Sequence, residues 1–299
     1  DSELIPWIAE SHTFNDDNTE ITIKIRPGVE WSDGHPWSAH DFAFTVNMLK
    51  DNAPQLMHST DMDAWVEEAV ALDSLTAKIT LKTPNPRFLF SYFVHSGDQG
   101  VPIVPKHIWE GQNPMEFSNY DLQKGWPVLT GPYEIAASEP AQRIWDLRPN
   151  WWAKKLGFQE LPNVERLIYL TYMEENKRVQ NLIANNIDTC LELRPANIVS
   201  LLDANPNITT WTGREPPYSY ITWWPISLGF NGLEAPWSDS EMRRAVNYAI
   251  NREQLVEIGW QNSGDWTHIP LPDLPQMRKY FTWTEDLVAK HQVGVFDLE

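Results

Sequence analysis

Strand-like and helix-like spacings of apolar residues alternate along this chain, and this alternation constrains the fold more than any other feature of the sequence. Isoleucines occupy every second position over residues 19–26, which predicts a half-buried strand that ends at a Pro-Gly turn. Ser38 and Asp41 then stand three residues apart, as in a capping box with Asp in place of the usual Glu, before apolar residues at helical spacing. A helix is therefore predicted from Ser38 to about residue 52.

The rest of the chain repeats this mixture of patterns. Alternation predicts an antiparallel pair at 70–72 and 75–81, and further strands at 133–137, 143–147, 167–172, 187–193, 208–211 and 226–230. Helical spacing and capping residues predict helices at 85–94, 174–185 and 196–203, from Ser238 with Glu241 as capping partner, and from Asn251. Such interleaved elements predict a mixed α/β (α+β) fold.

Charge and composition exclude several classes of protein. The 299 residues include 23 Lys+Arg and 41 Asp+Glu, a formal net charge of −18, and this field repels phosphate backbones, so no nucleic-acid partner is expected. The 42% hydrophobic and 21% charged residues are typical of globular chains rather than disordered ones. No apolar run approaches the roughly 18 residues that a membrane-spanning helix needs. The single cysteine, Cys190, excludes internal disulfides and multi-cysteine metal sites.

Tryptophan is unusually frequent, with 16 Trp beside 9 Tyr and 11 Phe. An indole ring can fill a core, or it can form a platform for a ring-shaped or amphipathic ligand. Composition alone leaves both interpretations open.

The titratable residues offer little support for catalysis or metal binding. Asp33 and Asp41 could form a carboxylate pair of the glycosidase type, but a turn position for Asp33 and a helix-capping position for Asp41 explain them better. The closest histidines, His35 and His40, lack metal-ligand spacing, and the sequence contains no HExxH, GxSxG or Gly-rich phosphate loop. We therefore predict no catalytic residue, no cofactor and no dedicated metal site.

Several segments resemble one family in order and spacing. The segment from Ile8 to Leu49, with its PGVEWSDGHPWSAHDF core, resembles the "LR.GV.W.DG.P" and "A.D..FS" pattern of the extracellular solute-binding proteins of ABC importers, peptide/nickel-binding family. TGPYEI at 130–135 resembles the family's "TGPY" strand. RVQNLIANNIDTCLEL is similar to its "R..AL..GEID" segment, with Asn185 and Asn186 replacing Gly-Glu. The stretch from Phe230 to Arg252 is similar to "FN...PPF.D..VR.A...AIDR", with Ala235 and Trp237 as departures.

This resemblance implies a two-lobed fold of the periplasmic-binding-protein type, type II. It divides the chain into an accessory domain of the first lobe at 1–127, the main α/β part of that lobe at 128–228, and the beginning of the C-terminal lobe at 229–299. Family members are longer, so the resemblance implies a partial chain that by itself binds ligand weakly or not at all.

The resemblance also implies where ligand would be held. The stretch YITWWPISLGFN matches the family's crossing between lobes, beside which the cleft lies. The ligand-contact candidates are therefore Trp223, Trp224, Ser227, Gly229 and Asn231, although adjacent tryptophans on a strand point to opposite faces, so only one of them can serve the cleft. By analogy with cleft-bordering loops of the accessory domain, Ser96 and Asp98 join the list.

The expected function is capture of an oligopeptide in the periplasm or outside the cell, free or lipid-anchored, and its delivery to a membrane permease by hinge closure without catalysis. The tryptophan excess keeps an oligosaccharide ligand as an alternative. Two other classes stay open at this point: a glycan-active enzyme, and a structural or sensory domain that reuses the fold.

Overall fold

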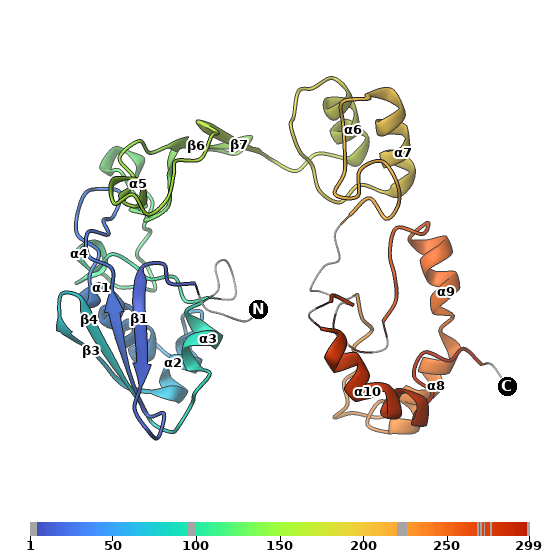
Figure 1. The fold of residues 1–299 in the computed structure, drawn as a ribbon, viewed down its shortest axis with the longest axis horizontal. Coiled ribbons are helices and arrows are strands. Elements are labelled where there is room, and N and C mark those ends of the chain that lie inside the picture. Colours follow the sequence, from blue (N-terminus) through green and yellow to red (C-terminus); the bar gives the residue numbers. More distant parts are fainter. Residues whose placement is uncertain are drawn as a thin grey trace. The chain divides into compact units, whose positions relative to one another are not determined.

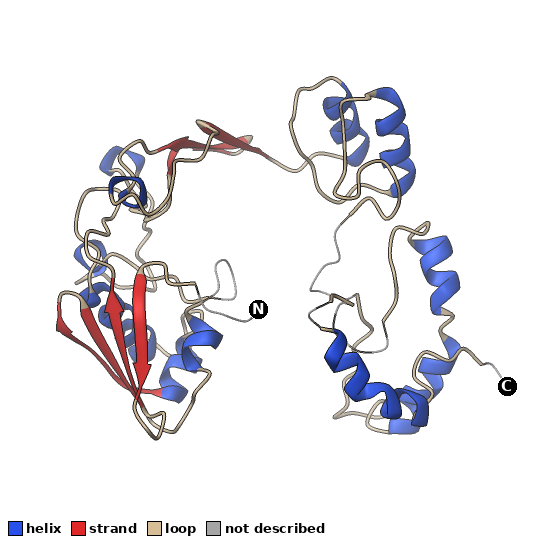
Figure 2. Cartoon of the chain, in the orientation of Figure 1, coloured by secondary structure: helices blue, strands red, loops and turns tan. Residues whose placement is uncertain are grey.

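The computed structural model describes residues 5–94, 100–219, 226–267, 269, 271, 273–275 and 277–297. The chain forms two compact units, an N-terminal unit of Ser2–Thr171 and a C-terminal unit of Tyr172–Glu299. Both strands and helices are present (Figures 1 and 2), as predicted for a mixed α/β fold. No helix within the described ranges is long and apolar enough to cross a membrane.

A four-stranded antiparallel sheet forms the first part of the N-terminal unit. Its order is β1-β2-β4-β3, from β1 (Ala9–Phe14), β2 (Glu20–Ile25), β3 (Val66–Asp73) and β4 (Thr76–Leu81). The isoleucines of β2 are buried and Ile21 pairs with Ile79, which confirms the strand predicted from alternation. The predicted hairpin is also present, with a first strand longer than the pattern indicated. Strand β1 was not predicted, because most of its residues are exposed and show no apolar alternation.

Helix α1 (Ala39–Asp51) covers this sheet, and it begins where the capping pattern predicted. Asp41 is buried, and its Oδ2 accepts the backbone N–H of Ser38 at 2.8 Å. The side chain of Asn47 binds β3 by donating to the Ala69 carbonyl oxygen at 2.7 Å. Phe42 and Val46 of this helix lie in the core. The structural interpretation of Asp41 is therefore confirmed.

Short elements complete the N-terminal unit, and one of them corrects a predicted boundary. They are α2 (Ser59–Trp65), α3 (Phe88–Tyr92), α4 (Lys106–Trp109), the 3-10 turn η2 (Leu122–Lys124) and α5 (Trp152–Lys155). We predicted a helix over 85–94 with Asn85 as N-cap. Instead, the Asn85 side chain accepts the N–H of Arg87 in a local turn, and the helix starts only at Phe88.

A second antiparallel sheet has the order β5-β6-β7, from β5 (Tyr133–Glu139), β6 (Gln142–Leu147) and β7 (Arg166–Leu170). These strands match the three predicted there. After β6 the chain enters the core at Trp151 and Trp152. The indole N–H groups of both tryptophans donate to the Thr130 carbonyl oxygen, each at 2.9 Å, so this one acceptor fixes the segment that leads into β5.

The described part of the C-terminal unit is helical. Its elements are α6 (Glu175–Ile183), α7 (Pro195–Ala204), α8 (Ser240–Ala249), α9 (Arg252–Gln254), the π-helical turn η3 (Leu255–Gly259) and α10 (Arg278–Lys290). α6 and α7 share a small core that includes Val179, Leu182 and Leu201. The start of α8 differs from the prediction: Asp239, not Ser238, is the N-cap and accepts the N–H of Glu241.

Three predicted strands of this unit are wrong. The segments 187–193 and 226–230 are irregular, and 208–211 forms only a single bridge between Thr210 and Gly213. A strand needs a neighbour to pair its backbone groups, and the described part of this unit provides none. In the first segment, the carbonyl oxygen of Leu191 instead accepts a hydrogen bond from the Arg178 side chain at 2.7 Å.

Glu175 connects α6 to the start of α7, and it makes that contact pH-dependent. Its Oε1 accepts the N–H of Arg194 at 2.6 Å and the side-chain amide of Asn197 at 2.7 Å. The hydrogen bond from the Arg194 N–H, more than any other contact, lowers the pKa of Glu175 below its usual 4.5. A lowered carboxyl pKa stabilises the folded state above the usual value, and this contribution is lost as the pH falls through the lower, folded-state value.

We therefore expect Glu175→Gln, which keeps an acceptor oxygen but does not titrate, to flatten the acid dependence of this unit. We measure the thermal midpoint by the circular dichroism signal of the helices at a series of pH values. Between roughly pH 5 and pH 3, this midpoint should fall less steeply with pH for the variant than for the unmodified protein. Glu174→Gln, one residue earlier, is the control. Equal slopes for all three proteins would contradict the assignment.

Candidate functional site

One face of the β5-β6-β7 sheet presents aromatic side chains. Because side chains alternate along a strand, register decides which of them share a face. Arg143 pairs with Tyr169 and Trp145 pairs with Leu167, so these four side chains lie on the same face of β6 and β7. Tyr169 is 61% exposed. A three-stranded sheet with one exposed tyrosine and two half-buried aromatic rings on a face is suited to contact another molecule or segment.

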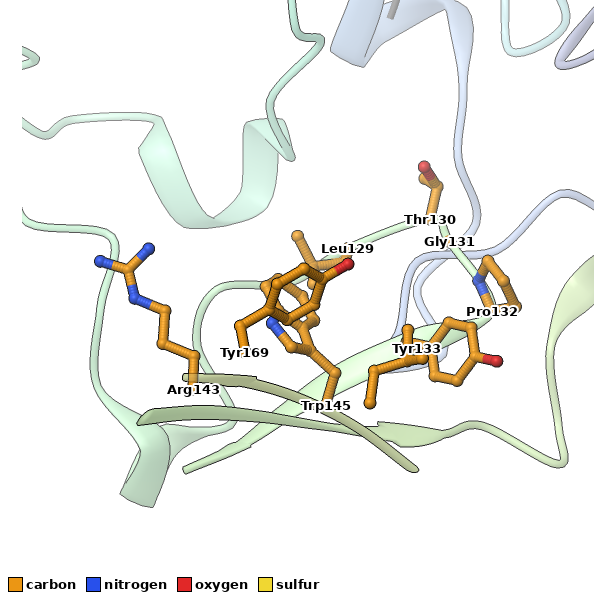
Figure 3. A pocket seen from close by; sticks show the side chains of 9 residues that line it. Leu129, Thr130, Gly131, Pro132, Tyr133, Arg143, Trp145 and Tyr169 are labelled. Atoms are coloured by element: carbon orange, nitrogen blue, oxygen red, sulfur yellow. The ribbon is translucent and has the colours of Figure 1, made fainter. Parts of the chain in front are cut away.

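These residues line an open hollow of about 570 Å³, shown in Figure 3. Tyr133, Trp145 and Tyr169 stand on the strands, and the segment from Leu129 to Pro132 forms the opposite wall. Nine residues line it: Leu129, Thr130, Gly131, Pro132, Tyr133, Arg143, Trp145, Leu167 and Tyr169.

Buried polar contacts hold the wall of the hollow in place. The guanidinium of Arg148, 7% exposed, donates to the carbonyl oxygens of Gly131 at 2.7 Å and Leu129 at 3.4 Å. Burial lowers the pKa of Arg148, while the negative charges of Glu134 and Asp33 act in the opposite direction. Together with the two indole N–H groups on Thr130, this side chain fixes the backbone of the wall without occupying the hollow.

The chemistry of the hollow is that of binding. Its rings can stack on the apolar face of a ring or an apolar side chain, and the exposed guanidinium of Arg143 can pair with a carboxylate. Arg143 makes no ion pair within the described residues. The lining contains no carboxylate, histidine, serine or cysteine that could act as acid, base or nucleophile. Its hydroxyl groups are those of Thr130 and the two tyrosines.

Asp33 and Asp41 do not form a catalytic pair. Asp41 is committed to the cap of α1 and also accepts the N–H of Lys106 at 2.8 Å. Asp33 accepts the N–H of His35 at 3.0 Å in its turn. Partial burial acts to raise the pKa of Asp33, but the hydrogen bonds from His107 and from the His35 N–H outweigh it and lower the pKa, whereas a general acid needs a raised value.

The residues expected at the cleft are only partly described. Trp223, Trp224, Ser96 and Asp98 lie outside the described residues. Ser227, Gly229 and Asn231 lie in an exposed, irregular segment of the C-terminal unit. The side chain of Asn231 accepts the N–H of Leu233 at 3.2 Å and so supports its own turn.

The residues that line the hollow were not predicted from the sequence as a binding surface. A signal was present, because Arg143, Trp145 and Leu147 alternate with Ile144 and Asp146. Both sets contain apolar residues, however, and the pattern alone did not indicate which face would stay uncovered. Only the pairing with β7 places Tyr169 beside Arg143.

A mixed α/β chain in two units agrees with the fold class that the resemblance to periplasmic binding proteins implies. The comparison with solved structures agrees: a periplasmic oligopeptide-binding protein of an ABC transporter from Thermotoga maritima matches with a TM-score of 0.78 and 26% identity, over 98% of this chain and 51% of that one. Residues 3–291 match the model of bacterial extracellular solute-binding proteins, family 5. The chain belongs to this family, and the resemblance stated above is confirmed.

One further relative and a second structure of the Thermotoga maritima protein bear on the ligand. The glutathione-binding protein GsiB of Pectobacterium atrosepticum is 25% identical over 290 residues, 96% of this chain and 51% of that protein. A mannohexaose-bound structure of the Thermotoga maritima protein matches with a TM-score of 0.73 and 27% identity, over 98% of this chain and 51% of that one. The chain thus spans about half the length of these relatives. Proteins of this class bind solutes without transforming them, which agrees with the prediction that the chain is not an enzyme.

Proposed function

We propose that this chain is part of the solute-binding component of an ABC importer, which captures an oligopeptide in the periplasm or outside the cell and delivers it to a membrane permease. The match to the family model over residues 3–291 carries the proposal. The ligand would stabilise a closed state of two lobes by contacts that the open state lacks, and the permease would bind that closed state. The chemistry of the aromatic hollow is consistent with binding.

An oligopeptide is the first choice of ligand. The family assignment favours it, and the curated relatives are named for glutathione, which is itself a peptide. The large number of tryptophans is a weaker argument for an oligosaccharide ligand once their positions are known. Trp31, Trp37, Trp151 and Trp152 are buried, and Trp65 and Trp126 pack against the same core. A tryptophan-rich core therefore explains much of the excess.

An oligosaccharide is the second candidate, and a specific observation favours it. The mannohexaose-bound relative has the same fold over 98% of this chain. Aromatic faces such as those of Trp145 and Tyr169 can stack on sugar rings, so the hollow suits either ligand class.

The domain limits and cleft residues belong to this proposal. We assign 1–127 to the accessory domain of the first lobe, 128–228 to the main part of that lobe and 229–299 to the start of the second. We assign ligand contact to Ser96, Asp98, Ser227, Gly229, Asn231 and one of the two adjacent tryptophans, Trp223 or Trp224.

Calorimetric titration of the full-length protein with a peptide panel that includes glutathione, and with a β-linked oligosaccharide panel, tests the function. We expect a Kd of about 10 µM or tighter for a peptide. Chromatography of each mixture should recover the ligand unchanged. Tight binding confined to oligosaccharides would select the second candidate, and conversion of any ligand would overturn both.

Substitution in the hollow tests whether its rings contact the ligand. We expect Tyr169→Ala to weaken binding of the titrated ligand about fivefold, since an aromatic contact contributes roughly 0.5–1.5 kcal/mol beyond its buried area. Ile168→Ala is a matched control, because Ile168 is 53% exposed on the opposite face of the same strand. If both variants bind like the unmodified protein, the hollow is not a ligand-contact surface.

A further inference from the structure

Tertiary structure brings His107 against Asp33 and His35, two side chains that lie far from it in the sequence. Asp33 and His35 lie in the turn before α1, and His107 lies on α4, more than 70 residues later. Asp33 Oδ2 is 2.6 Å from His107 Nε2 and 3.2 Å from His35 Nδ1. The two imidazole rings stack with centroids 4.0 Å apart and an angle of 18° between their planes. One oxygen atom thus faces a nitrogen of each ring.

Both segments that carry these side chains are held in place. The turn is closed by the Trp31 N–H, which donates to the His35 carbonyl oxygen at 2.8 Å, and Trp31 and Trp37 on either side of it are buried. The start of α4 is fixed by the Lys106 N–H, which donates to the buried Asp41 carboxylate at 2.8 Å. The three side chains are therefore positioned by the core rather than by mobile loops.

The donor set is one that transition metals bind. Two imidazole nitrogens and a carboxylate oxygen are common protein ligands of Zn²⁺ and its neighbours in the periodic table. Potential ligand atoms of the three residues lie within 4.8 Å of one another. Among the described residues, these three form a group that could hold a metal ion. An ion at about 2.0–2.2 Å from each atom would replace the present contacts of Asp33 with His107 and His35.

Exposure and charge also suit an ion that arrives from solvent. The side chains of Asp33 and His107 are 27% and 25% exposed, and that of His35 is 60% exposed. Water can therefore complete the coordination. The net charge of −18 raises the local concentration of cations around the molecule.

We propose that Asp33, His35 and His107 form a binding site for a divalent transition-metal ion, with Zn²⁺ as the probe. The ion joins the turn before α1 to α4 and so stabilises the N-terminal unit. This site is separate from the aromatic hollow, none of whose lining residues it shares. It does not depend on which solute the protein transports.

The test is titration of chelator-treated, full-length protein with ZnCl₂ alone. We expect the unmodified protein to bind one Zn²⁺ at this site with a micromolar Kd, and excess Zn²⁺ to raise the thermal midpoint of the N-terminal unit by about 4 °C. His35→Ala and His107→Ala should each weaken this binding at least tenfold and remove the thermal shift. His40→Ala, an exposed histidine five residues from His35, is the matched control and should leave both unchanged.

The His35→Ala variant also distinguishes loss of the metal site from misfolding. His35 is largely exposed, so His35→Ala should fold normally, as judged by circular dichroism without metal. The proposal is overturned if the unmodified protein shows no Zn²⁺ binding below about 100 µM, or if folded His35→Ala binds Zn²⁺ as tightly as the unmodified protein.

Discussion

Replacing Trp152 by Ala is expected to destabilise the N-terminal unit by about 3–5 kcal/mol, the range for removal of a large aromatic side chain from a packed core. Trp152 is 1% exposed, its ring stacks on Phe158 with centroids 5.8 Å apart, and it meets the edge of Trp7 at 6.4 Å. Its indole N–H also donates to the Thr130 carbonyl oxygen. The substitution therefore leaves a cavity and removes one of the two indole N–H groups that donate to Thr130 in the wall of the hollow.

Urea denaturation followed by far-ultraviolet circular dichroism measures this loss without depending on tryptophan fluorescence. Trp283→Ala is the control, because Trp283 is 69% exposed on α10 and its removal should change stability by less than about 1 kcal/mol. Trp152→Phe separates the two contributions, since it keeps a ring and loses the N–H. A loss for Trp152→Ala no larger than that for Trp283→Ala would contradict the described core.

Asp41→Ala should cost about 2–4 kcal/mol in the free energy of unfolding of the same unit. The carboxylate is 4% exposed and accepts the backbone N–H groups of Ser38 and Lys106, each at 2.8 Å. Loss of a helix cap costs about 1 kcal/mol, and a buried N–H left without an acceptor costs roughly 1–3 kcal/mol more. The substitution also releases the start of α4, which carries His107 of the proposed metal site.

Ser38→Ala is the comparison for this prediction. The Ser38 hydroxyl donates to the same carboxylate at 3.1 Å, but its removal leaves both backbone N–H groups bound to Asp41. We therefore expect a loss of no more than about 1 kcal/mol from Ser38→Ala in chemical denaturation. Similar losses for the two variants would mean that Asp41 contributes only the local cap and does not join α1 to α4.

Local patterns predicted most elements of the N-terminal unit, most clearly the strands and the helix that have one face in the core. β2 and β4 alternate between buried and less buried residues, and the apolar face and the cap of α1 both come from residues close together in the sequence. The predictions failed where pairing decided the outcome. Apolar residues at 187–193 and 226–230 looked like strands, but the described part of the C-terminal unit offers them no partner strand.

The sequence by itself determined the fold class, the family and the local roles of Asp33 and Asp41, since those depend on residues close together in the chain. Only the tertiary structure decided which side chains meet across long separations. Strand register placed Tyr169 beside Arg143, and packing of α4 against the turn before α1 placed His107 against Asp33. Such contacts depend on how whole elements pack against one another, and the spacing of residues along the chain does not predict that packing.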